Sequence, residues 1–228
     1  MSGRTSVTAL GLGDCERRRD GVLAQPANAL SSLSFVPVGM WIAARALRRP
    51  RSPYMVLLAS SVIANGVGSF LYHGPQPRAA KWVHDTAIAS LLLAVAAGRS
   101  ERAANSGFAP RPYAAALAGS GTLLAFQPDV VTLLTPALTG ACLAAEGVSL
   151  GRRRRLGWDG RRRRGHGVTL TLAGLTGVAF WAGRTDSPLC RPGSFLQWHA
   201  VAHVLAALTL GLYAEHLDEP PGRRASRG

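Results

Sequence analysis

The chain has 228 residues, a hydrophobic share of 47% and a formal net charge of +14 at pH 7. Twenty-five of its 26 basic residues are arginine, and they cluster between long apolar runs, which argues against a basic soluble protein that binds nucleic acid. The length suits a compact bundle of about seven membrane helices of roughly 20 residues each. We therefore expect an all-α, multi-pass integral membrane protein embedded in the lipid bilayer, with no nucleic-acid partner.

Seven apolar segments are each about as long as a bilayer crossing requires. They run approximately 28–46, 53–72, 82–98, 112–126, 130–150, 167–183 and 194–213. This pattern predicts a polar N-terminal arm over residues 1–27, a seven-helix transmembrane domain over residues 28–216, and a polar tail over residues 217–228.

Basic residues are distributed unevenly between the two sides of this bundle. Eighteen follow the first, third, fifth and seventh segments, whereas eight lie in the arm and in the connections on the opposite side. Because positive loops stay on the inner side of a membrane, the asymmetry predicts an outside N-terminus and an inside C-terminus. We expect the protein in the cell (inner) membrane.

Rare polar residues gather at the outer ends of three segments. The second segment ends with Ser69 and His73, the third begins near Asp85, and the seventh carries His199 and His203. At about 1.5 Å per residue, the last two lie roughly 8 and 14 Å into their helix. Residues four apart share one helical face, so these side chains are expected in one outer layer of the membrane.

Three histidines with an open fourth position are typical of a catalytic zinc site. His73, His199 and His203 are the predicted ligands, and bound zinc lowers the pKa of its water to roughly 7. Asp85 can accept a proton and Ser69 can donate to a developing oxyanion. His84 is a less favoured substitute ligand.

Three further polar residues are expected on or near the inner side, away from this site. His166 and His216 are interpreted as solvated, and Glu146 as snorkelling or pairing near the inner surface.

The three cysteines divide between the outer surface and the membrane. Cys15 lies in the arm and Cys190 in the outer connection before the last segment, so both face an oxidising compartment and can pair. Cys142 lies mid-membrane and is expected to be a buried thiol that behaves as a small apolar residue.

These residues together resemble the alkaline ceramidase family, within a wider group of seven-helix membrane hydrolases that includes adiponectin-receptor-like proteins. The matching elements are Asp14-Cys15-Glu16, Asn28 to Ser31, Ser69 to His73 with Asp85, Trp181 with Asp186 and Cys190, and Gln197 to His203. The resemblance implies zinc on His73, His199 and His203, amide hydrolysis with Ser69 and Asp85, and a disulfide between Cys15 and Cys190.

The arm departs from the family's calcium-binding pattern. Asp14 and Glu16 are the acidic residues that match it, but Arg18 stands where an Asn is expected and Gln25 where a Glu is expected. Fewer anionic oxygens and added positive charge predict weak calcium binding at best.

The expected function is therefore that of a hydrolase acting on carbon–nitrogen bonds in linear amides. Its substrate would be the N-acyl amide bond of a ceramide or a ceramide-like lipid, reached from the outer leaflet. Two alternatives remain open: a related membrane lipid esterase, and a non-enzymatic seven-helix receptor or scaffold with structural zinc.

Overall fold

The computed structural model describes residues 10–48, 53–104, 110–156 and 160–218. Within these ranges the chain is helical and forms no strand. The elements are α1 (Pro26–Ser32), α2 (Phe35–Arg48), α3 (Pro53–His73), α4 (Ala80–Ala104), α5 (Pro110–Phe126), the 3-10 helix η1 (Pro128–Val130), α6 (Val131–Leu156), α7 (Gly160–Ala182) and α8 (Trp198–Asp218). Most of the predicted polar tail lies outside the described residues, and α8 continues two residues into it.

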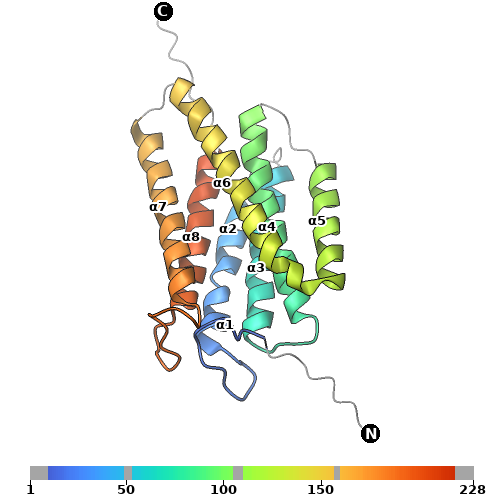
Figure 1. Ribbon diagram of the computed structural model, residues 1–228. Helices are drawn as coiled ribbons and strands as arrows, with labels where there is room; N and C mark the ends of the chain where they lie inside the picture. Colours follow the sequence, from blue (N-terminus) through green and yellow to red (C-terminus); the bar gives the residue numbers. More distant parts are fainter. Residues whose placement is uncertain (1–9, 49–52, 105–109, 157–159, 219–228) are drawn as a thin grey trace, which may run out of the picture.

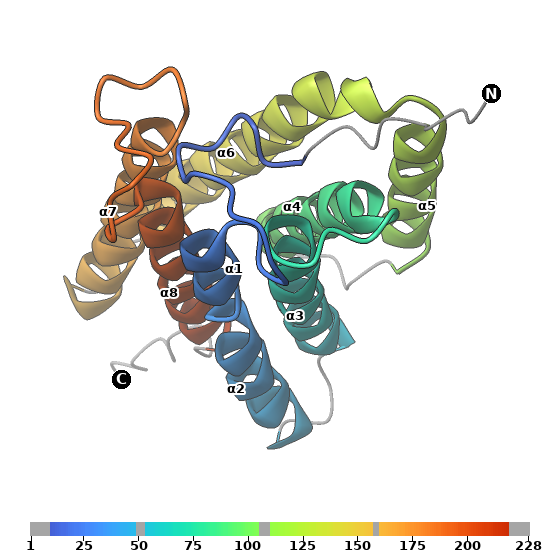
Figure 2. The same cartoon turned by 90° about the horizontal axis from the view of Figure 1, so that it is seen from below.

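The long helices form an up-and-down bundle (Figures 1 and 2). α3 packs against α2 and α4, α8 packs against α7, α1 and α2, and α6 crosses over α4. The C-terminal ends of α2, α4, α6 and α8 point to one end of the bundle, and the arm and α1 lie at the other end (Figure 1). An apolar core that includes Phe35, Ile42, Leu58 and Val62 joins α2 to α3.

The first predicted segment is interrupted near its start. α1 ends at Ser32 and α2 begins at Phe35, so two residues separate them. Pro37 explains the break, because it has no N–H to donate and its ring would clash with the carbonyl of Leu33 four residues earlier. The short α1 is therefore a separate element at the arm end of the bundle (Figure 1).

In the described part of the chain, five stretches are long and apolar enough to cross a membrane. They are Pro26–Arg48, Pro53–His73, Ala80–Gly98, Pro128–Gly151 and Trp198–Leu217. The other two predicted crossings, α5 and α7, are helical but fall short: α5 has 17 residues, and α7 has its apolar run diluted by polar residues such as His166 and by glycines. The prediction of an all-α membrane protein is thus supported, with five of the seven crossings meeting that measure of length and apolarity.

The N-terminal arm is tied to the connection between α7 and α8. Cys15 and Cys190 form a disulfide across a sequence separation of 175 residues, which confirms the predicted pairing. Backbone hydrogen bonds run alongside it, from Cys15 to the carbonyl of Gly183 (2.8 Å) and from Arg17 to that of Pro192 (3.0 Å). Cys142 takes no part in a disulfide, and it is half-buried instead of fully buried as expected.

Removal of the disulfide is expected to loosen the arm without unfolding the bundle. Cys190→Ser should lower the free energy of unfolding by about 2–5 kcal/mol, the scale measured for small secreted domains. Thermal unfolding in detergent measures this, with Cys142→Ser as the control that leaves the bridge in place. Equal melting temperatures for Cys190→Ser and the wild type would show that the bridge adds no stability.

Candidate metal centre

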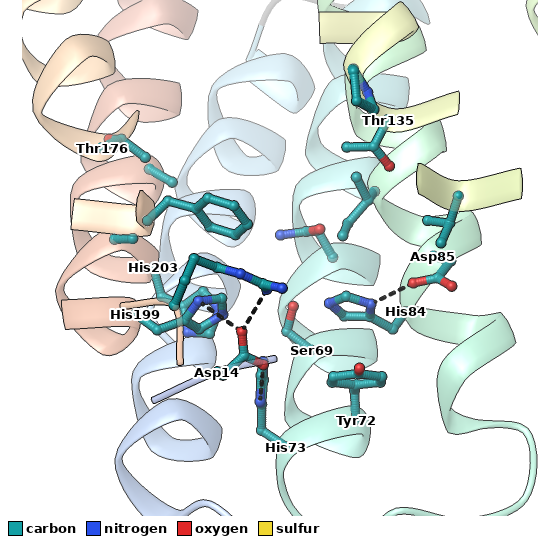
Figure 3. A pocket seen from close by; sticks show the side chains of 18 of the residues that line it. Asp14, Ser69, Tyr72, His73, His84, Asp85, Thr135, Thr176, His199 and His203 are labelled. Atoms are coloured by element: carbon teal, nitrogen blue, oxygen red, sulfur yellow. Dashed lines mark hydrogen bonds and ion pairs between the residues drawn. The ribbon is translucent and has the colours of Figure 1, made fainter. Parts of the chain in front are cut away.

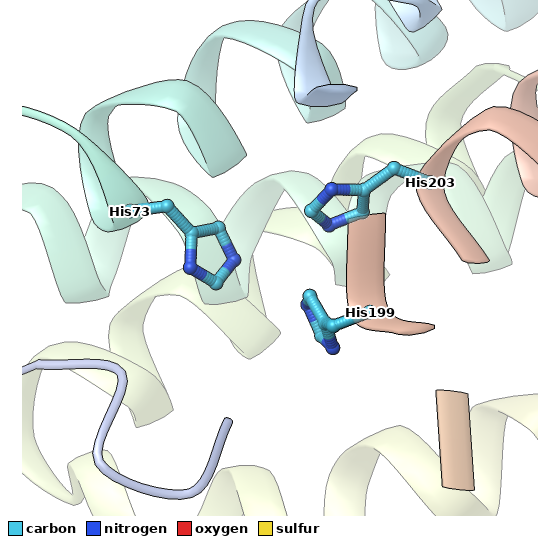
Figure 4. Close-up of side chains that lie close together, drawn as sticks. All are labelled: His73, His199 and His203. Carbon is cyan, nitrogen blue, oxygen red and sulfur yellow. The ribbon is translucent and has the colours of Figure 1, made fainter. Parts of the chain in front are cut away.

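Three histidine side chains from two helices converge at the arm end of the bundle (Figure 4). One potential ligand nitrogen from each of His73, His199 and His203 lies within 4.8 Å of the others, and all three residues are buried. The ring centroids are 4.6 Å apart for His199 and His203 and 5.1–5.4 Å apart for the pairs with His73. The three residues predicted as ligands are therefore together and can bind a metal ion.

The ends of α3 and α8 place these rings. His73 is the last residue of α3, and the chain turns at once through Gly74. α8 begins at Trp198 and not at the predicted Ser194, because the chain bends at residues 195–196, where the Gln197 side-chain amide donates to the carbonyl of Ser194 (2.6 Å). His199 and His203 consequently occupy the first two turns of α8, nearer the end of the bundle than expected.

The bundle leaves room for His199 only because the last turn of α7 is followed by a glycine. A Cβ at Gly183 would collide with the backbone of His199. The same glycine accepts a hydrogen bond from Cys15, so the arm, α7 and α8 meet at this point.

His203 is oriented by two hydroxyl groups of α1. Its Nδ1 lies 3.0 Å from the Ser31 hydroxyl and 3.3 Å from the Ser32 hydroxyl. Both hydroxyls donate to the carbonyl of Asn28 (3.0 and 2.7 Å), so their remaining lone pairs face the imidazole. His203 therefore carries its proton on Nδ1 and has Nε2 available as a ligand.

Asp14 is an acidic neighbour of the histidine cluster (Figure 3). Its carboxylate is 3.5 Å from Nδ1 of His199 and 3.9 Å from Nδ1 of His73. Burial raises the pKa of the Asp14 carboxyl to about 6, against the opposing effect of Arg184, whose guanidinium lies 3.1 Å away.

A cavity of about 560 Å³ opens beside the three histidines, within the usual range of small-molecule sites. Ser69, which is buried on α3, points into it one turn from His73 (Figure 3). The opposite walls come from α6 and α7, with Val131, Thr135 and Phe180 among the lining residues. The cavity is thus polar beside the three histidines and Ser69 and largely apolar along its other walls.

Asp85 lines the same cavity but is turned away from the three histidines (Figure 3). Its carboxylate is 2.6 Å from the Lys81 ammonium and accepts a hydrogen bond from Nδ1 of His84 (2.8 Å). The His84 ring stacks on Tyr72 (centroids 4.3 Å apart) and lies 6.1 Å from the ring of His73. His84 therefore stands between Asp85 and the cluster and is not one of the convergent ligands.

Asp14 and Glu16, the two acidic residues that match the family's calcium-binding pattern, both contact other groups of the protein. Both carboxylate oxygens of Glu16 accept backbone hydrogen bonds, from Ala27 and Asn28 (2.8 Å each), and Asp14 pairs with Arg184. In the described part of the chain, the three histidines form a group of metal-ligating side chains that neither residue joins. In the described part of the arm, both acids are thus already paired with backbone or side-chain donors, which agrees with the weak calcium binding predicted from the sequence.

The expectation of a solvated His166 was wrong. His166 is 2% exposed, and its Nε2 lies 2.5 Å from the Glu146 carboxylate. His216 is half-buried, with its ring 6.5 Å from that of His166. The Glu146 carboxylate on α6 thus gives the buried His166 ring on α7 a polar partner inside the apolar bundle.

Sequence reasoning did not single out Arg184, Tyr72 or the serine pair as parts of the site. Arg184 was counted as one outer basic residue among eight, and Ser31 only as part of a matching motif. No spacing signal connects them to the histidines, since their contacts depend on where the arm and α1 fold back.

No model of a known protein family matches the chain, and no curated protein matches it significantly.

Loss of one predicted ligand is expected to abolish metal binding. His203→Ala should lower the metal content of purified protein from about one equivalent to near zero, because two imidazoles hold a divalent ion poorly. Elemental analysis after extensive dialysis measures this. His216→Ala on the same helix is the control and should retain the metal; equal loss from both variants would argue against the cluster as the binding site.

Proposed function

We propose that the protein is a zinc-dependent membrane amidase that cleaves the N-acyl bond of a ceramide or a ceramide-like lipid. The observation that carries the proposal is the buried cluster of His73, His199 and His203 beside Ser69, in one cavity within a bundle of apolar helices. The resemblance of the sequence to alkaline ceramidases supports the same reading.

Zinc is the metal that suits this donor set best. Three neutral imidazoles without a fourth protein ligand are typical of catalytic zinc, whereas structural sites are closed by four ligands. In the described residues no fourth side chain joins the three histidines. When bound, zinc would polarise the amide carbonyl and acidify a water molecule.

The chain's own polar residues have distinct roles in the proposed reaction. Ser69 would donate a hydrogen bond to the oxygen of the scissile carbonyl as negative charge develops there. Asp85 and His84 form a hydrogen-bonded pair at the cavity wall, and we assign proton acceptance to the Asp85 carboxylate acting through this pair. The proton would then be returned to the leaving amine.

The proposed orientation puts the arm, the disulfide and the metal centre on the outer side. Helix ends followed by arginine-rich connections gather at the opposite end of the bundle, which is the inner side by the positive-inside rule. A lipid of the outer leaflet could then present its amide near the interface while its acyl chain stays among the apolar walls. The cell membrane is the proposed location.

The orientation is tested by reporter fusions. A reporter fused after Gly151 or Gly228 should give an inner-side signal, because both positions lie on the side that carries 18 of the 26 basic residues. An outer-side signal at either position would contradict the proposed orientation.

Asp85→Asn is expected to keep zinc and to lose turnover by about 10²–10⁴-fold, the usual contribution of a general acid–base group. Fatty-acid release from a panel of N-acyl and ester lipids, measured beside zinc content, tests this. Lys81→Met is the matched control: it removes the 2.6 Å ion pair with Asp85 and leaves the His84 contact, so activity should fall no more than about threefold. Equal losses in the two variants would mean that Asp85 matters only as an ion-pair partner.

Ser69→Ala is expected to retain zinc and to lose about 10²-fold in turnover, the scale of one oxyanion donor. Unchanged activity would remove Ser69 from the reaction. If the wild type releases fatty acid from esters and not from amides, the protein is instead a lipid esterase. Zinc without any hydrolysis, together with unfolding of the histidine variants, would favour a receptor or scaffold with structural zinc.

A further inference from the structure

The side chain of Gln25 is fully buried and links the N-terminal arm to His73. Its amide nitrogen donates to the carbonyls of Gly11 (3.0 Å) and Glu16 (2.9 Å), and its amide oxygen lies 2.8 Å from Nδ1 of His73. The backbone N–H of Gln25 also donates to the carbonyl of His73 (2.8 Å). The same residue thus holds both the backbone and the ring of one predicted ligand.

These contacts fix the orientation of the amide and, through it, the tautomer of His73. Backbone carbonyls only accept hydrogen bonds, so the NH₂ group of Gln25 must face Gly11 and Glu16. The amide oxygen must then face His73, which has to carry its proton on Nδ1 to donate to it. The other ring nitrogen, Nε2, keeps its lone pair, and it is buried with no hydrogen-bond partner among the described residues.

We propose that Gln25 is a positioning residue of the metal centre, which holds His73 as the Nδ1–H tautomer with Nε2 directed at the metal. Ligating histidines commonly donate their second N–H to an acceptor that fixes the ring, and removal of that acceptor typically lowers metal affinity about 10–100-fold. The inference rests on the proposed zinc site and not on the proposed amide chemistry.

The residues around Gln25 restrict the orientation of its side-chain amide. The backbone carbonyl of Glu16 accepts a hydrogen bond from Gln25. The two carboxylate oxygens of Glu16 accept hydrogen bonds from the backbone N–H groups of Ala27 and Asn28, in the first turn of α1. Its neighbour Cys15 carries the disulfide to Cys190. A Cβ at Gly11, where φ is +74°, would collide with the Gln25 amide, so the arm closes directly over it. The hydrogen bonds of the Gln25 amide therefore join the arm to the end of α3.

Three variants of the full chain in detergent separate positioning from packing. Gln25→Met keeps the length of the side chain and removes every hydrogen bond, whereas Gln25→Glu keeps an acceptor for His73 and loses the two donations. Gln76→Met is the control, because Gln76 also ties the arm to the end of α3, through the carbonyls of Leu10 (3.3 Å) and Tyr72 (2.9 Å), with its side chain bonded to none of the three histidines. Zinc affinity is measured by competition with a chromophoric chelator, which needs no substrate.

The expected result is a loss of about 10–100-fold in zinc affinity for Gln25→Met, and a change within about threefold for Gln25→Glu and Gln76→Met. An equal loss in Gln25→Met and Gln76→Met, no loss in Gln25→Met, or a loss beyond about threefold in Gln25→Glu would overturn the inference. If Gln25→Met does not fold, the zinc affinity of Gln25→Glu is the test, and a loss of more than about threefold would overturn the inference. A wild type that binds no zinc would overturn the proposed function, and this inference with it.

Discussion

The structure depends on hydrogen-bond partners for three imidazole rings that are buried in an apolar bundle. Burial of a polar group that gains no hydrogen bond lowers the free energy of unfolding by about 1–3 kcal/mol in protein mutational data. His73 and His203 meet part of this demand with their Nδ1 atoms, through Gln25 and the α1 hydroxyls. The Nε2 lone pair of His73 has no hydrogen-bond partner among the described residues, and a bound cation would satisfy lone pairs of several rings at once.

The helices supply the positions of the rings, and the arm supplies their orientation. Residues from Gly11 to Ser32 reach His73, His199 and His203 from outside the bundle, through an amide, a carboxylate and two hydroxyls. An arm of this length has little apolar surface of its own to bury. The covalent tie at Cys15, together with the backbone hydrogen bonds beside it, reduces the conformational freedom that the arm would otherwise lose on docking.

The sequence was informative where the position of a residue along a helix can be counted from the helix end. Residue spacing put His199 and His203 on one face, and matching depth put His73 beside them; charge asymmetry put Cys15 and Cys190 on one side. It was less informative where a side chain has several possible hydrogen-bond partners within reach. Asp85 turns to Lys81, four residues earlier on α4, and to His84, and this choice depends on local rotamers as well as on depth. The break before α2 was readable from Pro37, but its consequence, the placement of Ser31 and Ser32 against His203, was not.

In the described residues, the histidines at the two ends of the bundle have different partners. At the far end from the arm, His166 directs Nε2 at the Glu146 carboxylate, so a side chain already occupies the position a cation would take. At the arm end the Asp14 carboxylate lies near Nδ1 of His73 and of His199 and is paired with Arg184. The acid therefore lies behind the rings and not between them. Histidines in a membrane bundle are poor indicators of metal until the partner of each ring nitrogen is known, and here those partners leave the cluster open on its inner side.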